Sequence, residues 1–272
     1  MKLLDALLLG IVQGLTEFLP VSSSGHLALL QSRWGYSPEQ STAFSVVLHL
    51  GTLLAVVVAY RRSLLALLSQ HRAALWPLAL GTAPLVLVVP VKDYVDRVAG
   101  SPTLLGLAFF FTAGLLVVAD APWRAREPEP APEDGEAPAV EAPAQGVARL
   151  SPPLALAIGF AQAFAVIPGI SRSGSTISAA MLGRVKPVVA AEFSFLLAIP
   201  AILGAGVLEA RKIQGLAQEN TAALLLGFSA SALTGVLAIV ALKWLLRRRR
   251  FWVFAPYLVI LGALTVWGGA SG

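Results

Sequence analysis

The sequence contains no cysteine and few charged residues. Of its 272 residues, 13% are Asp, Glu, Lys or Arg, whereas 57% are hydrophobic. The lack of cysteine excludes disulfides and thiol catalysis. Soluble domains carry a charge on about a quarter of their residues, so this composition indicates a protein embedded in a lipid bilayer.

The basic residues do not form a nucleic-acid-binding pattern, although the formal net charge is +5. Lys and Arg stand at the ends of apolar runs, where membrane topology places them. The first residues show no small-residue cleavage site, so we expect no removable signal peptide. The sequence therefore predicts a multi-pass membrane protein with no nucleic-acid partner.

Six apolar runs are predicted to cross the bilayer as helices, because about 20 apolar residues suffice for one crossing. They cover residues 42–60, 75–91, 103–119, 190–208, 222–242 and 253–270. Two shorter, interrupted regions are each predicted to form a re-entrant helix pair, at 3–31 and 153–183. Irregular backbone at membrane depth is tolerated only inside protein or beside water. The predicted fold class is thus an all-α polytopic membrane protein.

A stretch rich in proline and acidic residues separates the two halves of the chain. Residues 121–149 have the composition of a disordered linker, and we expect their replacement to be tolerated. The predicted first repeat is therefore 1–120, and the second is 150–272.

The two halves match at one offset. Six pairs of identical residues lie 149 positions apart: Gly10 and Gly159, Gln13 and Gln162, Gly25 and Gly174, Pro38 and Pro187, Phe44 and Phe193, Ser45 and Ser194. This regularity predicts an internal repeat. Each half holds three predicted crossings, and an odd number makes the repeats inverted. Interrupted segments at matching positions of inverted repeats indicate a binding site at mid-membrane, where the two interruptions meet.

The distribution of Lys and Arg predicts the orientation. One side of the predicted topology collects most of them, including Arg61, Arg62 and the run from Arg247 to Arg250. The richer side is cytoplasmic by the positive-inside rule. Both termini are then expected outside and the linker inside.

The interruption in the second half, Ile167 to Thr176, concentrates hydrogen-bond donors around one arginine. An ionisable residue at membrane depth is costly and usually functional, which makes Arg172 the foremost candidate. Together with the hydroxyls of Ser171, Ser173 and Thr176 it forms a candidate phosphate site. Two structural alternatives stand beside this one. Arg172 could form a buried salt bridge with Glu17, and Ser171 could cap a helix.

The interruption in the first half carries candidates for the chemistry. Gln13 and Glu17 are four residues apart and share a helix face. Ser22, Ser23 and Ser24 precede His26, so the run contains either a nucleophile with a nearby base or a helix cap. The alternatives for His26 and Glu17 are packing and ion pairing.

His49 lies inside a predicted spanning helix, remote in sequence from both interruptions. A structural or polar-gap role is favoured for it. No pair of acids or histidines has metal-ligand spacing, which argues against a metal cage built by the protein alone.

The interrupted segments of the two halves resemble sequence motifs of the undecaprenyl-diphosphate phosphatase family of the bacitracin-resistance type. That family carries a Glu/Gln-x-x-x-Glu motif, a Pro-Val-Ser-Ser-Ser/Thr-Gly-His segment and a Pro-Gly-x-Ser-Arg-Ser-Gly-x-Thr motif. Here they read Gln13 to Glu17, Pro20 to His26 and Pro168 to Thr176. The similarity extends over nearly the whole chain except the linker.

The resemblance implies an integral membrane enzyme that removes the terminal phosphate of undecaprenyl diphosphate and so recycles a lipid carrier for cell-wall synthesis. It implies a bacterial cytoplasmic membrane, an active site open to the outer face, and stimulation by a divalent cation, Mg²⁺ or Ca²⁺. It leaves a homodimer open. The implied catalytic residues are Glu17, Ser23, His26 and Arg172. The expected phosphate-binding residues are Ser22, Ser24, Gly169, Ser171, Arg172, Ser173 and Thr176.

Gln13 stands where many relatives have an acid, which removes one carboxylate and leaves Gln13 a supporting role. Glu17 is then the candidate metal ligand. The nucleophile stays open between Ser23, His26 and a water molecule. The main alternative function is a lipid-phosphate transporter or flippase, because inverted repeats with broken helices are also transporter architecture.

Overall fold

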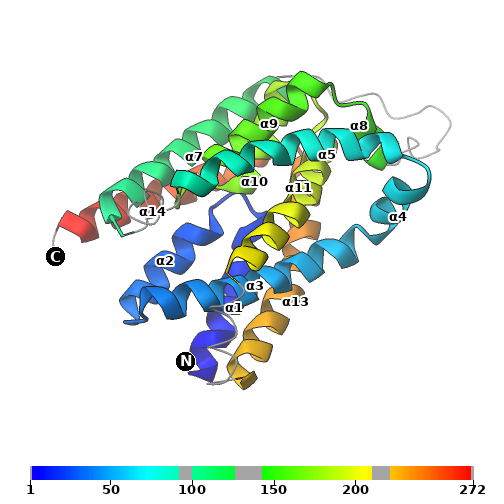
Figure 1. The fold of residues 1–272 in the computed structure, drawn as a ribbon. Helices are drawn as coiled ribbons and strands as arrows, with labels where there is room; N and C mark the ends of the chain where they lie inside the picture. The colour runs from blue at the N-terminus through cyan, green and yellow to red at the C-terminus, as the bar shows by residue number, and fades with distance from the viewer. Residues whose placement is uncertain (1, 92–99, 126–142, 210–220, 271–272) are drawn as a thin grey trace.

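The computed structural model describes residues 2–91, 100–125, 143–209 and 221–270, and all regular elements in these ranges are helices (Figure 1). The first half comprises α1 (Leu3–Phe18), α2 (Ser23–Arg33), α3 (Pro38–Ala59), α4 (Arg61–Ser69), η1 (Arg72–Ala74), α5 (Leu75–Thr82), η2 (Ala83–Val91) and α7 (Pro102–Arg124). The second comprises α8 (Pro143–Ala148), α9 (Pro152–Phe164), α10 (Arg172–Leu182), α11 (Pro187–Leu208), α13 (Thr221–Arg247), η3 (Phe251–Phe254) and α14 (Ala255–Ala270). The predicted all-α class is confirmed.

Six helical segments within the described ranges are long and apolar enough to cross a membrane. They are Gln40–Ala59, Arg72–Pro90, Pro102–Arg124, Pro187–Leu208, Thr221–Arg247 and Phe251–Gly269. Each overlaps one predicted crossing. The Arg72–Pro90 span changes from the α-helical α5 to the 3₁₀ segment η2, which contains Pro90. Proline lacks the backbone N–H that would continue an α-helical ladder.

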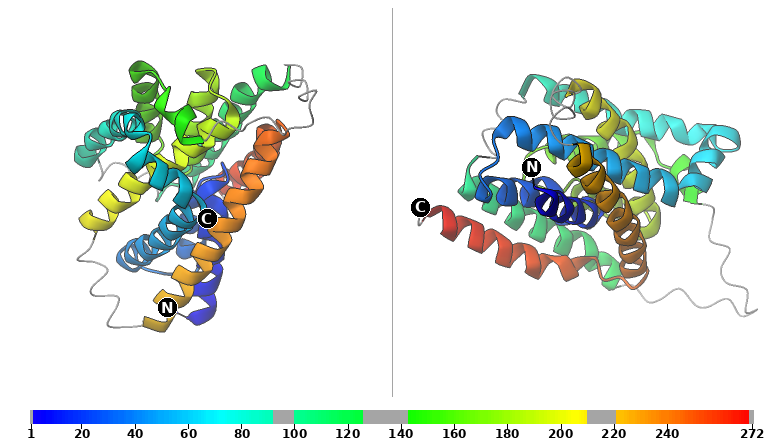
Figure 2. Two further views of the ribbon diagram at one scale, coloured as in Figure 1. Left: turned by 90° about the vertical axis from the view of Figure 1, so that its right-hand side faces the viewer. Right: turned by 90° about the horizontal axis from the view of Figure 1, so that it is seen from below.

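The helices pack against one another in several groups. α1 lies along α13, and α13 also packs on α3, while α14 lies along α7 (Figures 1 and 2). α10 contacts α7, α9 and α11. Glycines allow the closest approaches: a Cβ atom added to Gly14 would meet the Thr234 hydroxyl at 2.0 Å. The α1–α13 contact therefore depends on a residue without a side chain.

The 149-residue offset extends to the helix boundaries. α2 begins at Ser23 and α10 at Arg172, and each has 11 residues. α3 begins at Pro38 and α11 at Pro187, and each has 22 residues. Equal helices at one offset agree with an internal repeat. The inverted relation of the halves and the re-entrant path of the short helices stay predictions.

Both predicted bounds of the linker, 121 and 149, are wrong, because a helix extends into this range from each side. α7 continues through Arg124, and α8 begins at Pro143. Val147 is fully buried and Leu150 nearly so, both in the main hydrophobic core. Burial of these apolar side chains stabilises a helix that proline-rich composition argued against. Residues 126–142 lie outside the described residues.

Helix α4, which directly follows α3, was not predicted from the sequence. Its nine residues are too few for a crossing. Leu67 is buried in the core, whereas Leu65 and Leu68 are exposed. α4 therefore packs against the core through one side. Its sequence lacks the long apolar run from which the crossings were predicted.

Candidate functional site

Two helix N-termini face the same region, and each is capped by a serine. The Ser22 hydroxyl accepts a hydrogen bond from the Gly25 amide at 3.4 Å at the start of α2. The Ser171 hydroxyl accepts one from the Gly174 amide at 3.0 Å at the start of α10. The capping alternative is thus confirmed for both serines. Helix N-termini present free amides and a positive dipole end, which favour anions.

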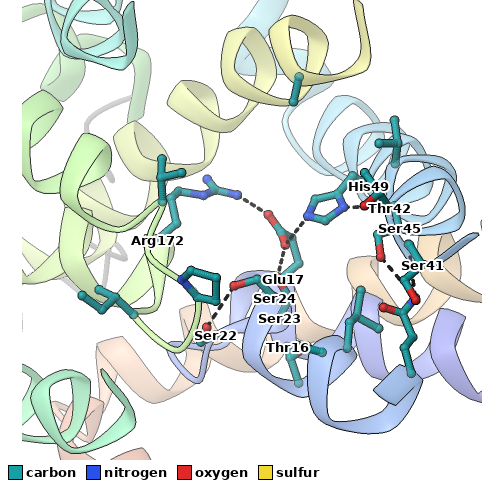
Figure 3. Close-up of a pocket in the computed structure, with 18 of the residues that line it drawn as sticks. Thr16, Glu17, Ser22, Ser23, Ser24, Ser41, Thr42, Ser45, His49 and Arg172 are labelled. Carbon is teal, nitrogen blue, oxygen red and sulfur yellow. Dashed lines mark hydrogen bonds and ion pairs between the residues drawn. The ribbon is translucent and has the colours of Figure 1, made fainter. Parts of the chain in front are cut away.

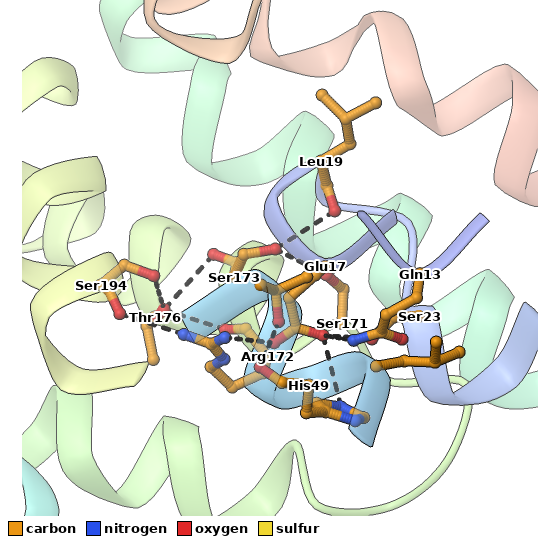
Figure 4. Close-up of polar contacts among 12 residues, drawn as sticks. Gln13, Glu17, Leu19, Ser23, His49, Ser171, Arg172, Ser173, Thr176 and Ser194 are labelled. Carbon is orange, nitrogen blue, oxygen red and sulfur yellow. Dashed lines mark hydrogen bonds and ion pairs between the residues drawn. The ribbon is translucent and has the colours of Figure 1, made fainter. Parts of the chain in front are cut away.

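Glu17, the second-to-last residue of α1, connects these two helix starts. Its Oε2 atom accepts hydrogen bonds from the Ser23 hydroxyl at 2.5 Å and from the Gln13 side-chain amide at 3.0 Å (Figure 4). Its Oε1 atom pairs with the Arg172 guanidinium. The predicted salt bridge is confirmed. A buried carboxylate that accepts the hydrogen of a serine hydroxyl is also a base poised at a nucleophile.

Arg172 is held by two partners from different elements. Besides the pair with Glu17, its Nη1 atom donates to the Ser194 carbonyl of α11 at 3.1 Å (Figure 4). A guanidinium offers five N–H donors in a rigid plane. Fixing two edges of that plane orients the charge before any ligand binds, which is the arrangement required to stabilise a phosphate.

His49 also belongs to this cluster, a position that was not predicted from the sequence. Its Nε2 atom lies 3.5 Å from Glu17 Oε2, and its Nδ1 atom lies 2.7 Å from the Ser45 carbonyl oxygen (Figure 3). The signal was present, since a histidine inside an apolar helix usually has a function. Nothing in the sequence predicted that α3 packs close to Glu17.

A cavity of about 760 Å³ opens beside these residues (Figure 3). Glu17, Arg172, His49 and the serines at positions 22, 23, 24 and 171 line it. Its polar wall continues along α2 and α3 through Gln31, Ser41 and Ser45. An apolar wall comes from Val166, Ile170, Ala201, Ile202 and Ala205. Such a two-sided cavity suits a ligand with a charged head and an apolar tail.

Tyr36, between α2 and α3, also lines this cavity. Its hydroxyl donates a hydrogen bond to the Asp5 carboxylate of α1. Burial raises the pKa of Tyr36 above its usual value, and the bond to Asp5 raises it further. Tyr36 is therefore a neutral donor at this wall.

The contacts of His26 lead away from Glu17 and Arg172, with which it was expected to act. Its Nδ1 atom is 2.7 Å from the Ser22 carbonyl oxygen, and its Nε2 atom is 2.6 Å from the Tyr257 hydroxyl. Its ring stacks on Tyr257 and meets Phe109 edge-on. The imidazole points to Phe109 of α7 and Tyr257 of α14, and the cavity is lined by other residues of α2.

Three expected phosphate ligands are also separated from the cavity. The Ser173 hydroxyl donates to the Leu19 carbonyl at 3.2 Å, and the Thr176 hydroxyl bonds Ser194 at 2.6 Å and the Arg172 carbonyl at 2.9 Å (Figure 4). These hydroxyls join α10 to its neighbours. Gly169 has φ +90, and a Cβ there would meet the Ala108 side chain at 2.7 Å. It makes a turn against α7.

The site supplies oxygen atoms suited to a divalent cation. Gln13 Oε1 is buried and lacks a hydrogen-bond partner among the described residues, and Glu17 lies one helical turn away. No group of three or more acids or histidines with metal-holding geometry occurs in the described part of the chain. Mg²⁺ usually keeps several waters and is bound by one or two carboxylates together with substrate phosphates. Glu17, which lines the cavity, is the carboxylate that fits this mode.

The chain is similar to known proteins over nearly its whole length. Residues 6–264 match the family described as bacitracin resistance protein BacA. An undecaprenyl-diphosphatase of Carboxydothermus hydrogenoformans is 36% identical over 279 residues, covering 100% of this chain and 99% of the relative. A relative of the same name from Korarchaeum cryptofilum is 39% identical, with coverages of 96% and 97%. One from Alcanivorax borkumensis is 38% identical, with coverages of 97% and 98%.

The family match covers most of the chain, and the relatives align with it nearly end to end. It includes both capped helix starts, Glu17, His49 and Arg172. The chain therefore belongs to the bacitracin resistance protein BacA family.

Proposed function

We propose that this membrane protein hydrolyses undecaprenyl diphosphate to undecaprenyl phosphate and inorganic phosphate. One observation carries the proposal: Ser23 donates its hydroxyl hydrogen to Glu17, while Arg172 pairs with the other oxygen of the same carboxylate. A nucleophile, a base and a phosphate-binding cation thus meet at one wall of the cavity. The names of the relatives support this substrate.

In the proposed first step the Ser23 oxygen attacks the terminal phosphorus, and Glu17 accepts the hydroxyl proton. The bond from this phosphorus to the bridging oxygen breaks, so undecaprenyl phosphate leaves and a phosphoserine remains. Water then hydrolyses the phosphoserine, and phosphate is released. Arg172 and the two helix N-termini stabilise the charge on the transferring group.

The alternative nucleophile is a water molecule oriented by Ser23, with Glu17 again as base. His26 is omitted from both versions because its two nitrogen atoms contact Ser22 and Tyr257. Glu17, which accepts the hydrogen bond of the Ser23 hydroxyl, is therefore the proposed base in both versions.

We also propose that Glu17, oriented by the side-chain amide of Gln13, would hold a divalent cation together with the substrate. A bound cation would neutralise charge on the diphosphate oxygens. The apolar wall formed by Ile170, Ala201 and Ile202 is proposed to receive the first isoprene units.

Phosphate release by the purified protein in detergent tests this function. We expect turnover of undecaprenyl diphosphate in wild-type protein, reduced by a chelator and restored by Mg²⁺ or Ca²⁺. Transport requires a sealed bilayer, so a lipid-phosphate flippase without chemistry would release no phosphate in detergent. The names of the relatives do not favour that alternative.

We propose further that the protein lies in the bacterial cytoplasmic membrane with the cavity open to the outer face. The lack of native cysteine allows a direct test. Ser32 is exposed and lines the cavity, whereas Arg248 follows α13 on the predicted cytoplasmic side. In intact cells, a membrane-impermeant maleimide should label Ser32→Cys and spare Arg248→Cys. The reverse pattern would contradict this orientation.

A further inference from the structure

His26 sits behind the proposed nucleophile, between α2 and α14. Its Nε2 atom lies 2.6 Å from the hydroxyl of Tyr257, a residue 231 positions away in sequence. The two rings stack with centroids 5.7 Å apart and planes 12° apart. Phe109 closes the other side, with its ring centroid 5.8 Å from that of His26. The imidazole is thus fixed in position and in rotation.

The direction of each hydrogen bond follows from the partners. A backbone carbonyl only accepts, so His26 Nδ1 carries a hydrogen and donates it to the Ser22 oxygen over 2.7 Å. In the neutral imidazole Nε2 is then an acceptor, and the Tyr257 hydroxyl donates to it. The chain of donors therefore runs from Tyr257 through His26 to Ser22.

The Ser22 carbonyl belongs to the peptide group that leads into Ser23. Ser22 has φ +68, in the left-handed region that residues other than glycine seldom occupy. Such a conformation persists only where the surroundings impose it. The Ser22 carbonyl accepts from both the His26 amide, at 3.3 Å, and His26 Nδ1, and two donors fix the plane of this peptide group.

We propose that His26 and Tyr257 are positioning residues that orient the Ser23 hydroxyl toward Glu17 through the Ser22–Ser23 peptide group. This inference rests on the proposed phosphatase function and on Ser23 as the reacting residue. The Ser22 carbonyl requires the His26 tautomer with hydrogen on Nδ1, and the Tyr257 hydroxyl supports this tautomer by donating to Nε2. The Nδ1 hydrogen in turn holds Ser22 in its unusual conformation. Neither side chain needs to touch the substrate.

The first test is Tyr257→Phe in the full-length purified enzyme. The ring, its stacking and its volume stay, while the hydroxyl is lost. We expect kcat to fall about three- to tenfold, the usual weight of one neutral hydrogen bond, with KM unchanged. Tyr60→Phe is the matched control, because its hydroxyl is buried without a hydrogen-bond partner among the described residues. It should keep the wild-type kcat.

The second test separates the two nitrogen atoms of His26. The amide nitrogen of Asn can occupy the position of Nδ1, whereas that of Gln reaches the position of Nε2. His26→Asn should therefore retain the bond to Ser22 and match Tyr257→Phe in kcat. His26→Gln should lose that bond and fall at least about tenfold further. Because Asn no longer reaches Tyr257, adding Tyr257→Phe to His26→Asn should cause no further loss.

The outcomes separate the positioning role from the function on which it rests. Wild-type protein that releases no phosphate would overturn the proposed function and the positioning role together. An active wild type with an unchanged kcat in Tyr257→Phe would overturn the positioning role alone. So would equal kcat values for His26→Asn and His26→Gln, or losses that multiply in the double variant. A rise in KM at constant kcat would assign both residues to substrate binding instead.

Discussion

The guanidinium of Arg172 and the carboxylate of Glu17 form an ion pair across 155 positions of the sequence. Glu17 lies in the last turn of the first helix of one half of the chain, and Arg172 begins a helix of the other. The same carboxylate oxygen pair also binds Ser23, Gln13 and His49. The contact that joins the halves therefore also assembles the proposed nucleophile, its base and the cation that receives phosphate.

Arg172→Ala is expected to reduce phosphate release by about a thousandfold, the order found when a transition-state arginine is removed. The variant leaves Glu17 buried without its counter-charge, which costs about 3–5 kcal/mol of stability. Turnover and thermal unfolding in detergent measure the two effects. Arg33→Ala is the matched control, since Arg33 is exposed at the end of α2. Wild-type turnover in Arg172→Ala would contradict the site.

Arg172→Lys distinguishes charge from shape. Lysine keeps the positive charge and loses the planar fork that bonds Glu17 and Ser194 together. We expect stability close to wild type with turnover still at least about tenfold lower. Full turnover in this variant would mean that a point charge suffices.

Ser23→Ala tests the nucleophile. Removal of the hydroxyl should reduce turnover by at least about a hundredfold, because the covalent route closes and an unassisted water replaces it. Ser69→Ala is the control, since the Ser69 hydroxyl of α4 donates to the Leu65 carbonyl four residues earlier in the same helix. Rapid quenching of wild-type protein should trap labelled phosphoserine at position 23. Full activity in Ser23→Ala would leave water as the nucleophile.

His49 is predicted to assist Glu17 from α3. His49→Ala should reduce turnover about tenfold, the order of one lost polar contact to a charged group, because Glu17 loses a neighbour at 3.5 Å. His49→Gln should recover most of the activity, since its amide can reach the place of Nε2. Equal losses in both variants would show that the imidazole itself is required. Initial-rate measurements over a range of substrate concentrations decide between these results.

The sequence revealed Glu17, Ser23 and Arg172 because polar groups in apolar surroundings are conspicuous. It could not reveal the direction of His26, since that depends on which side of α2 faces the cavity. One turn of helix separates His26 from Ser22, and the imidazole therefore returns to the Ser22 carbonyl. The position of His49 beside Glu17 was not predicted, for the same reason. Its proximity to Glu17 arises from the packing of α3, which local sequence does not encode.

Apolar run length predicted the six long helices but not the short ones. α4 and α8 contain nine and six residues, and each is stabilised by a few buried side chains such as Leu67 and Val147. Helices this short are marginal in isolation and depend on tertiary contacts. Proline-rich composition near α8 further masked it. Both helices required the packed structure to be recognised.

Gly14 is predicted to be essential for the packing of α1 on α13. A Cβ there would lie 2.0 Å from the Thr234 hydroxyl and 2.4 Å from the Ser231 carbonyl oxygen. Gly14→Ala should therefore destabilise the protein by about 1–3 kcal/mol, the usual cost of overpacking. Gly114→Ala is the control, because a Cβ atom added at Gly114 would meet nothing within 4 Å. Thermal unfolding in detergent compares the two, and equal stabilities would contradict the close α1–α13 contact.

Replacement of residues 126–142 tests the boundary between linker and fold. A Gly/Ser segment of the same length should leave turnover and unfolding temperature unchanged, because the native composition is proline-rich and acidic, with little apolar surface to bury. Val147→Asp, a few residues later, should lower the unfolding temperature markedly. Val147 is fully buried in the core, and an unpaired carboxylate there is costly. If the Gly/Ser replacement were the more destabilising change, the linker would have to begin and end elsewhere.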